Sequence, residues 1–536
     1  MSRDNPRMTA LLAILCAFAG SSTGCSSDDS MMMNGNDLPI VCQPGAADGS
    51  FWLTEGELVE VTVGCQLADA EPLPGDRFVF DSLPPGATYD PATATLSWTP
   101  DLDQAAVYDL GLSVTDLDGN GDIDSDSAGN PDLRESGAFR IGVADRFDDP
   151  ENLPIADPYT YTHEFGVPVF HLLATPTDAS AYTPTRIIYQ GRAYTAEAKL
   201  RGRTSLGYPK NSYTLKFPAN YALSEPERDF IDKQRVVLTQ HFDDNSYFRT
   251  RLAFDAWNLL DPTVTVQTYS AVVYIEGEFM GIYTAGDHVD DDLMVAHGLP
   301  QAGNLYKATN HDANFRLVTR TGDPKSTLHQ GYEKKAGDPA SGPGAFDDLD
   351  QLVNFVATSS DSEFAAQIAT LIDTDDYMNW LILASFISAG DSGGKNSYHY
   401  HHTDTLWHAI PWDFNGSFGQ AWNTLRTSSQ SVDYFAWTNE IFTRMRNDPT
   451  LAGVLAQRFR GALDDSFSVE AWNARIDQYR VDLPAAVIAR DQARWGELML
   501  SFDRWSDRPD LTTPDEEIAY IRAWLAERHA VYDALY

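Results

Sequence analysis

The chain has 536 residues, of which 43% are hydrophobic and 12% aromatic, so it can form two or three globular domains and is not a disordered protein. It carries 78 acidic and 38 basic residues, which gives a net charge of −40. Nucleic-acid-binding proteins need basic surfaces to meet phosphate backbones, so this balance argues against nucleic acid as a general partner. The acidity instead fits a solvated surface protein.

The first residues have the pattern of an export signal. Arg3 and Arg7 form a short basic segment, and an apolar run follows over residues 8–20. This run is too short to cross a bilayer, as is typical of the apolar part of a signal peptide. We therefore expect residues 1–24 to be a signal peptide.

Residues 22–25, Ser-Thr-Gly-Cys, resemble a bacterial lipobox, in which the cysteine is lipidated and becomes the new N-terminus. The resemblance implies a lipid on Cys25. Ser26 stands where an Asp would imply the inner membrane, so we expect the outer membrane. The lipid would be the only anchor, because no other stretch is apolar over about 18 residues. Residues 25–38 are polar and predict a flexible tether.

Two cysteines remain after this processing. The chain has four in all; Cys16 leaves with the signal peptide and Cys25 carries the lipid. In an exported protein, Cys42 and Cys65 predict a disulfide. The alternative is two free buried cysteines.

Residues 39–146 show short β-type runs separated by turn residues, which predicts a small all-β sandwich. The segments Leu83–Ala87, Leu96–Pro100 and Val114–Asp116 resemble immunoglobulin-like or cadherin-like modules of bacterial surface proteins. The runs lie at residues 58–63, 77–80, 95–98 and 108–114.

An acidic loop inside this region predicts a calcium site. Oxygen-bearing side chains alternate with other residues, and glycines allow a tight turn, as a hard cation requires. The twelfth position is Ser127 rather than Glu, so a dockerin-like or cadherin-like loop is expected and not a full EF-hand. The alternative is an acidic surface hairpin. The expected ligands are Asp116, Asp118, Asn120 and Asp122.

From about residue 150 the pattern becomes mixed, with strands first and helices later, which predicts an α+β domain with an N-lobe and a C-lobe. The chain ends in a predicted amphipathic helix over Pro514–Leu535. The other strands are expected at residues 196–201, 213–217, 236–239, 271–275 and 281–285, and the other helices at 247–260, 346–357, 363–372 and 375–387.

One ordered set of residues has the pattern of phosphoryl transfer. This reaction requires a carboxylate near the attacking hydroxyl and oxygen ligands for magnesium. Protein kinases supply them as Asp-x4-Asn, a strand segment and then a second Asp. Here Asp391 and Asn396 have that spacing, and two predicted strands, residues 397–402 and 406–410, lead to Asp413.

A basic segment between residues 192 and 216 is a candidate cradle for a triphosphate, because it holds six basic residues and a single acid, Glu197. The alternative is an exposed β-face. A Gly-x-Gly-x-x-Gly loop does not precede it, so a standard protein kinase is not indicated. The basic residues are Arg192, Lys199, Arg201, Arg203, Lys210 and Lys216.

Two further clusters suggest metals, but we interpret them otherwise. His399, His401 and His402, with His408, could indicate zinc, yet no nearby cysteine completes a site. Asp290–Asp292 is interpreted as the start of a helix, where the helix dipole favours acidic side chains.

Several motifs, in order, resemble the spore-coat protein H (CotH) kinase family over roughly residues 160–536. For example, Pro209–Phe217 resembles the family's Pro-Lys-Lys-Ser-Tyr-x-Leu-Lys-Phe segment. The other segments that carry the resemblance are Arg201–Ser205, Asp244–Arg249, Tyr274–Tyr283, Asn304–Lys307 and Pro411–Gly419.

The resemblance implies a divergent protein-kinase-like fold over residues 150–536 that uses ATP with Mg²⁺ or Mn²⁺. It implies that Asp391 is the catalytic base, and that Asn396 and Asp413 hold the metal. Asn415 replaces the second Asp of a Pro-Trp-Asp-x-Asp pattern as a further oxygen ligand, and Asp287 stands where the family commonly has Glu. The expected nucleotide-binding residues are Arg201, Lys210, Lys216, Asp287 and Lys307.

Two functions follow as hypotheses. The first is an exported, lipid-anchored atypical protein Ser/Thr kinase that phosphorylates a secreted or surface protein rich in Ser or Thr. The second is a surface adhesion or scaffold protein that uses a kinase-like fold for binding without catalysis. Retention of Asp391 and Asp413 favours the enzyme.

Overall fold

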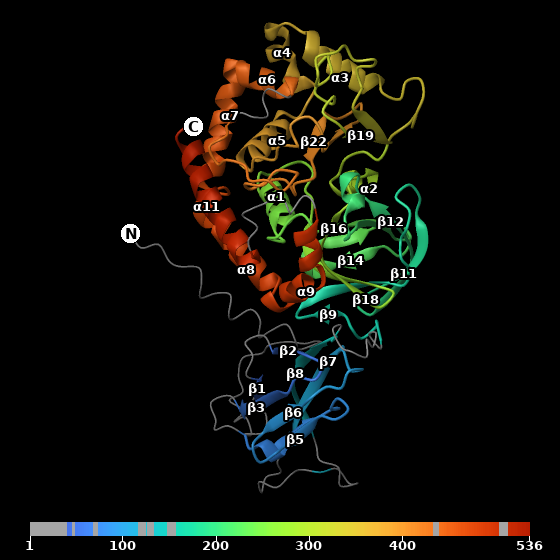
Figure 1. The fold of residues 1–536 in the computed structure, drawn as a ribbon, viewed down its shortest axis with the longest axis vertical. Helices are drawn as coiled ribbons and strands as arrows, with labels where there is room; N and C mark the ends of the chain where they lie inside the picture. Colours follow the sequence, from blue (N-terminus) through green and yellow to red (C-terminus); the bar gives the residue numbers. More distant parts are fainter. Residues whose placement is uncertain are drawn as a thin grey trace, which may run out of the picture.

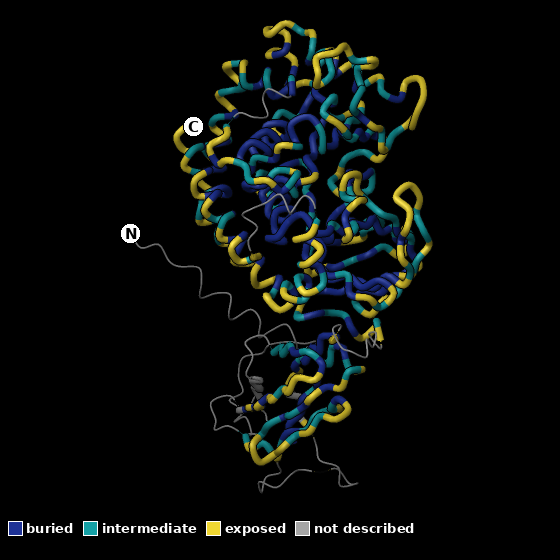
Figure 2. Tube along the Cα trace, viewed as in Figure 1, coloured by how far each residue is buried: buried dark blue, intermediate teal, exposed yellow. Residues whose placement is uncertain are grey.

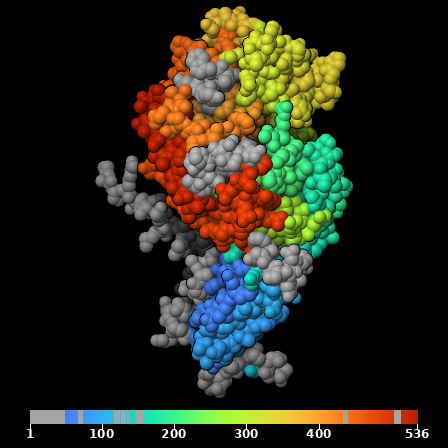
Figure 3. Space-filling view, viewed as in Figure 1, coloured from blue at the N-terminus to red at the C-terminus, as the bar shows by residue number. Residues whose placement is uncertain are grey.

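The computed structural model has an N-terminal all-β part and a larger mixed part (Figure 1). In the space-filling view the β part projects as a separate mass from the larger body (Figure 3). The residues that the structure describes are 40–44, 49–67, 73–115, 125, 133–146, 157–432, 439–502 and 513–536.

The N-terminal part contains two four-stranded sheets, ordered β1-β3-β6-β5 and β2-β8-β7-β4. Both contribute side chains to one core, including Leu96 and Trp98 from the first sheet and Val114 and Ile141 from the second. The predicted β-runs all fall on these strands. Their immunoglobulin-like character stays a prediction. The bounds are β1 Ile40–Pro44, β2 Ser50–Thr54, β3 Val59–Leu67, β4 Phe78–Phe80, β5 Thr88–Asp90, β6 Thr95–Trp98, β7 Ala106–Thr115 and β8 Leu133–Ala144.

Cys65 is disulfide-bonded, and the antiparallel register of β1 and β3 places it opposite Cys42. Several other predicted features lie outside the described residues. These are the signal peptide, the tether with Cys25, and the calcium loop with Asp116, Asp118, Asn120 and Asp122.

The larger part begins with a sheet that closes on itself. Its order is β11-β12-β13-β16-β18-β17-β10-β9, and β11 also pairs with β10. Side chains alternate across it, because Val236 and Leu238 point into the barrel while Val237 packs on the helical side. The bounds are β9 His163–Glu164, β10 Val167–Leu172, β11 Thr183–Tyr189, β12 Arg192–Arg201, β13 Ser212–Lys216, β16 Arg235–Gln240, β17 Thr268–Ile275 and β18 Glu278–Asp287. Two further strands, β14 Leu223–Glu225 and β15 Phe230–Lys233, pair with each other in a separate two-stranded sheet.

The rest of the chain is mainly helical around a second sheet, β20-β19-β21-β22. Its strands are β19 Asn304–Ala308, β20 Tyr332–Ala336, β21 Ser397–His401 and β22 His408–Pro411. The helices are α1 Arg249–Asn258, α2 Asp291–Ala296, α3 Asp347–Thr358, α4 Asp361–Gln367, α5 Thr374–Phe386, α6 Glu440–Asn447, α7 Pro449–Asp464, α8 Val469–Asp482, α9 Ala485–Ser501 and α11 Pro514–Asp533.

The sequence explains where several helices begin. Ser360 with Glu363, and Thr513 with Glu516, form capping boxes at α4 and α11, and the Asp373 side chain caps α5. Helix α5 is apolar over most of its surface and lies in the buried centre of the larger part (Figure 2). None of the helices in the described ranges has the length and apolarity needed to cross a membrane.

The predicted succession of strands and then helices is confirmed, and the chain is a mixed α+β protein. The predicted helices and strands of this part coincide with α1, α3, α4, α5, α11 and the barrel strands to within a few residues. The interpretation of the barrel and the helical region as two kinase lobes stays a prediction.

Candidate active site

The hairpin of β21 and β22 brings together residues that are distant in sequence. Ser397 pairs with Pro411, so the residue before β21 and the residues after β22 lie at the same end. The Trp412 amide donates a hydrogen bond to the Asn396 carbonyl at 2.8 Å. Asn396 and Asp413 therefore approach each other, as the sequence order predicts, and both have left-handed backbones, with φ of 55° and 66°. Such conformations are uncommon outside glycine and often occur at functional sites.

Asp413 is exposed to solvent and lines a concave site, called the cleft below. Displacement of water by the surrounding protein raises its pKa, as does the negative charge of Asp391, while Lys307 and Arg201 act in the opposite direction. The four charged groups thus form one electrostatic cluster. A small cavity beside Asp413 is lined by Trp412, Phe414 and Asp287, among other residues.

Asp391 is held as a carboxylate by two basic side chains. Lys395 Nζ lies 2.9 Å from one of its oxygens, and His311 Nε2 lies 3.7 Å from the other. Burial raises the pKa of Asp391, but His311 and Lys395 outweigh that effect and hold the pKa below its usual value. The partly exposed carboxylate can therefore accept a hydrogen bond from a hydroxyl at neutral pH. Sequence reasoning did not single out His311.

Two of the predicted phosphate-binding residues lie at this cluster. The Arg201 guanidinium, at the end of β12, lies 5.0 Å from the centre of the Trp412 ring, and Lys307 Nζ on β19 lies 5.3 Å from that of Tyr398. Both lower the pKa of Asp413, so their charges act on the cleft. Lys395 acts on Asp413 in the same direction, but it is paired with Asp391.

The structure gives Lys210 a different partner from the one expected. Its ammonium lies 2.5 Å from an Asp491 oxygen, and both side chains are almost fully buried. Asp491 also accepts hydrogen bonds from the Ile282 amide and the Tyr247 hydroxyl. An ammonium enclosed in this way cannot reach a nucleotide, so we do not retain Lys210 as a phosphate ligand. Its role is to tie α9 to the barrel.

Lys216 and Asp287 each have a partner that the sequence pattern did not indicate. Lys216 pairs with Glu197 at 2.7 Å on the exposed barrel surface. Buried Asp287 pairs with Lys233 at 2.7 Å and accepts a hydrogen bond from the Gln267 amide. Burial raises the pKa of Asp287, and Lys233 opposes the rise. Asp287 nevertheless lines the same cavity as Asp413, so it lies beside the cleft.

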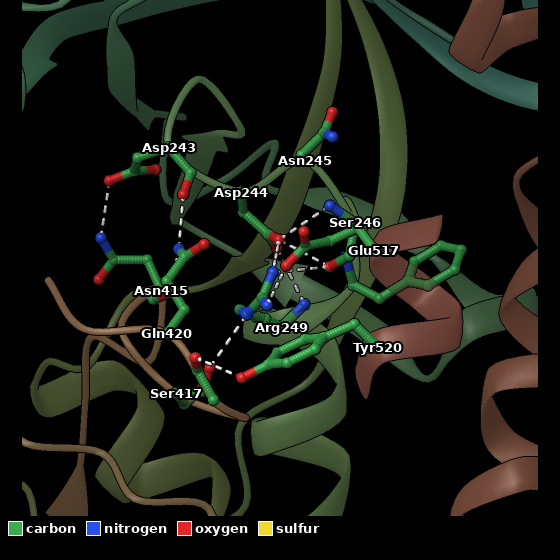
Figure 4. A network of polar contacts seen from close by, with 12 residues as sticks. Asp243, Asp244, Asn245, Ser246, Arg249, Asn415, Ser417, Gln420, Glu517 and Tyr520 are labelled. Carbon is green, nitrogen blue, oxygen red and sulfur yellow. Dashed lines mark hydrogen bonds and ion pairs between the residues drawn. The ribbon is translucent and has the colours of Figure 1, made fainter. Parts of the chain in front are cut away.

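Asn415 follows Asp413 and is held by a residue that sequence reasoning missed. Its Nδ2 donates a hydrogen bond to Asp243 Oδ2 at 2.7 Å (Figure 4). Asp243 is buried, and burial raises its pKa to about 7; the Asn415 hydrogen bond lowers it, and the charges of Asp244 and Asp413 raise it. The only sequence signal was its position just before the family-like Asp244–Arg249 segment.

A buried ion network fixes the segment after Asp413. Arg249 pairs with Asp244 at 2.7 Å and with Glu517 at 2.5 Å, and all three side chains are almost fully buried. The same guanidinium donates from Nε to the Ser417 carbonyl at 3.0 Å (Figure 4). The start of α1, the start of α11 and the loop that follows Asp413 are therefore held together by one side chain.

The oxygen-rich residues of the cleft suit a hard cation. Asp413 offers a carboxylate, and Asn396 and Asn415 offer amide oxygens, which are the donor types that Mg²⁺ and Mn²⁺ prefer. The negative charge gathered at Asp413 and Asp391 has the sign that such an ion would neutralise.

The Asp290–Asp292 cluster begins a helix, as predicted, and its three carboxylates lie close together. Asp290 caps α2 by accepting a hydrogen bond from the Leu293 amide. The histidines have separate partners: His399 contacts the Tyr377 hydroxyl, His401 contacts Asp348 and His408 contacts Asp376. His408, Asp376 and Asp373 lie close together, and the His408–Asp376 ion pair accounts for that approach.

The comparisons with known proteins fit this site. The family model for CotH kinase protein matches residues 198–532, which include every cleft residue described above. The inner spore coat protein H of Bacillus subtilis (strain 168) is 25% identical over 280 residues, which cover 52% of this chain and 73% of that protein. Because the family model spans more than half of its length, the chain belongs to the CotH kinase protein family.

Proposed function

We propose that this chain is an ATP-dependent protein Ser/Thr kinase. The single observation that carries the proposal is the set of charges around Asp413, a solvent-exposed carboxylate that lies within electrostatic reach of Asp391, Lys307 and Arg201. Phosphoryl transfer depends mainly on positioning and on charge stabilisation, and these residues provide a base, metal ligands and cations.

Each residue has a distinct role in the proposed reaction. Asp391 accepts a hydrogen bond from the acceptor hydroxyl, orients it and receives its proton as the hydroxyl oxygen bonds to the γ-phosphorus. The bond from that phosphorus to the β–γ bridging oxygen breaks in the same step, and ADP leaves. Asp413 and Asn396, with Asn415, would hold Mg²⁺ or Mn²⁺, which supplies positive charge to the phosphate oxygens. Arg201 and Lys307 bind the phosphate groups. Lys216 stays a candidate because its ammonium is exposed, although Glu197 competes for it.

The setting of the enzyme is proposed from the sequence. The signal peptide and Cys25 support export and a lipid anchor, with the outer membrane as the destination. A secreted or surface protein rich in Ser or Thr would then be the substrate, and the acidic loop at Asp116–Asp122 would bind Ca²⁺ in the β part. The net charge of −40 supports a protein partner over nucleic acid.

The test is label transfer from ATP carrying ³²P on the γ-phosphate. The chain from Ser26 onward is incubated with Mg²⁺ or Mn²⁺ and a Ser-rich protein, beside Asp391→Asn and Asp413→Asn. Both substitutions keep side-chain size and should reduce transfer at least about 100-fold. Glu60→Gln, at an exposed position of β3 in the other part, is the matched control and should transfer label as the wild type does.

If neither the wild type nor the variants transfer the γ-label, and the α-label of ATP is not transferred either, the kinase proposal fails. The adhesion or scaffold function would then account for the chain. Transfer of the α-label alone would indicate adenylylation on the same scaffold.

A further inference from the structure

An amide side chain at a metal site has an orientation problem. Asn415 offers one oxygen and one NH₂ group, and a half-turn about its last bond exchanges them. Only the oxygen can bind a cation. A carboxylate in its place would present oxygen either way, so a chain with Asn at this position needs a neighbour that fixes the amide.

Asp243 has the chemistry to do this. Its Oδ2 accepts from Asn415 Nδ2 at 2.7 Å, and the side chain is 4% exposed. The Tyr208 hydroxyl donates to the same oxygen at 3.4 Å, and Gln240 Nε2 approaches the other oxygen at 3.4 Å. The three side chains around the Asp243 carboxyl group thus all donate hydrogen bonds to it. An acceptor draws the NH₂ group of Asn415 toward itself and turns Oδ1 away.

The backbone around both residues is also fixed. Gln420 Nε2 donates to the carbonyl of Asp243 at 2.7 Å and to the carbonyl of Asn415 at 3.2 Å (Figure 4). One side chain therefore connects the two segments and sets the separation at which the Asp243–Asn415 hydrogen bond forms. The Asp243–Asn415 hydrogen bond therefore links the turn before α1 to the loop after β22.

We propose that Asp243 is the positioning residue of the metal site: it orients the Asn415 amide so that Oδ1 faces the cation beside Asp413. The inference rests on the metal role assigned to Asn415 under the proposed function. It assigns Asp243 no contact with substrate or metal. Outer residues that orient metal ligands typically change metal affinity ten- to hundredfold when replaced.

The hydrogen bond between Asp243 and Asn415 can be tested by exchanging the two side chains. Asp243→Asn leaves two amides that can bond in either orientation, so Oδ1 is no longer fixed. Asn415→Asp places two carboxylates at 2.7 Å, where like charges repel. The double variant Asp243→Asn with Asn415→Asp restores a donor and an acceptor in reversed order. It also supplies an oxygen to the metal in either orientation.

The test is Mn²⁺ binding to the chain from Ser26 onward, followed by the loss of the electron paramagnetic resonance signal of free Mn²⁺. The proteins are wild type, both single variants, the exchanged double variant, and Glu60→Gln as a carboxylate-to-amide control at an exposed position of the β part. Asp243→Asn should bind Mn²⁺ about ten- to hundredfold more weakly. The double variant should bind at least as tightly as wild type, and Glu60→Gln should stay within about twofold of it.

Wild-type affinity in Asp243→Asn would overturn the inference, as would a double variant that does not fold or that binds no better than Asp243→Asn. If Asp243→Asn does not fold, the Mn²⁺ affinity of the double variant still tests the inference.

The variant Asp413→Asn separates a failure of this inference from a failure of the proposed function. If it abolishes binding while Asp243→Asn has no effect, only the positioning role fails. If wild type binds no Mn²⁺, the metal site fails and the inference with it. Mn²⁺ binding without phosphoryl transfer would remove the kinase proposal alone.

Discussion

Lys210 and Asp491 form an ion pair at 2.5 Å although 281 positions separate them in the chain. Each side chain is no more than 2% exposed. The rings of Tyr283 and Trp495 lie 5.1 and 5.9 Å from the ammonium. This pair joins the barrel to helix α9. Without Asp491, the buried Lys210 ammonium would lie in an apolar interior with no opposite charge beside it.

The first prediction follows from that pair. Lys210→Met should lower the free energy of unfolding by about 3–5 kcal/mol, because it leaves the Asp491 carboxylate buried without its cation. Lys216→Met removes an exposed pair and should cost no more than about 1 kcal/mol. Urea unfolding followed by tryptophan fluorescence measures both. A Lys210→Met protein that is as stable as wild type but fails to bind ATP would restore the phosphate-binding role expected from the sequence.

A second prediction concerns Arg249, whose guanidinium neutralises Asp244 and Glu517 in the interior. Arg249→Met should destabilise the chain by about 3–5 kcal/mol, because the buried Asp244 carboxylate loses its cation. Glu517 keeps a second cation, since Arg426 lies 2.6 Å from the same carboxylate. The loop with Ser417 also loses its hydrogen bond to Arg249 Nε. Differential scanning calorimetry measures the effect. Arg316→Met, which removes a partly exposed pair with Glu440, is the control, and an equal loss in both variants would contradict the role given to the network.

Much of the candidate site could be predicted because its logic is local. Asp391, Asn396 and Asp413 are spaced by two short strands that pair with each other, and an antiparallel hairpin necessarily brings its outer ends together. Strand and helix positions followed in the same way from periods of two and 3.6 residues. These signals need no knowledge of distant contacts.

The remainder depends on packing between distant segments. Three residues have partners that come from distant segments, and the charge pattern along the chain does not reveal them. Lys210 pairs with Asp491, Asp287 with Lys233, and Asn415 with Asp243. Closure of the barrel is similar, because the parallel pairing of β10 with β17 and its antiparallel pairing with β11 depend on the three-dimensional path of the chain. The basic residues of the segment around Lys210 therefore do not share one role. Arg201 lies at the cleft, Lys210 is buried against Asp491, and Lys216 is paired with Glu197 on the surface.

A third prediction concerns pH and stability at Asp255. Burial raises its pKa to about 6, while Arg251 acts in the opposite direction. The native state therefore holds a proton that the unfolded state releases near pH 4, so this residue's contribution to stability is present at low pH and is lost as pH rises toward 6. Asp255→Asn should remove that loss, so its stability relative to wild type should increase between pH 4 and 7. Urea midpoints across this range provide the measurement, and a constant difference would contradict the assignment.

Asp348 should have the opposite dependence. Burial raises the pKa of this carboxyl, but hydrogen bonds from His401, Tyr306 and Asn304 outweigh burial and lower it to about 2. Its contribution is then present above the unfolded value near 3.8 and is lost as pH falls toward 2. Asp348→Asn should accordingly lose stability at pH 6 but much less at pH 2.5. A variant with the same deficit at both values would show that the hydrogen bonds do not depend on the charge.

The last prediction concerns His311 and the proposed base, Asp391. His311 and Lys395 together hold the pKa of Asp391 below its usual value, and the carboxylate must be ionised to accept a hydroxyl proton. His311→Gln removes one source of positive charge, so the pKa of Asp391 should rise. The acid limb of the pH–rate profile for phosphoryl transfer should then move to higher pH, with a smaller change in the rate at pH 8. His329→Gln, which alters a similar pair with Asp350, should leave the profile in place. A uniform loss of rate at every pH in His311→Gln would instead assign His311 a purely structural role, because only an electrostatic effect on Asp391 shifts the limb.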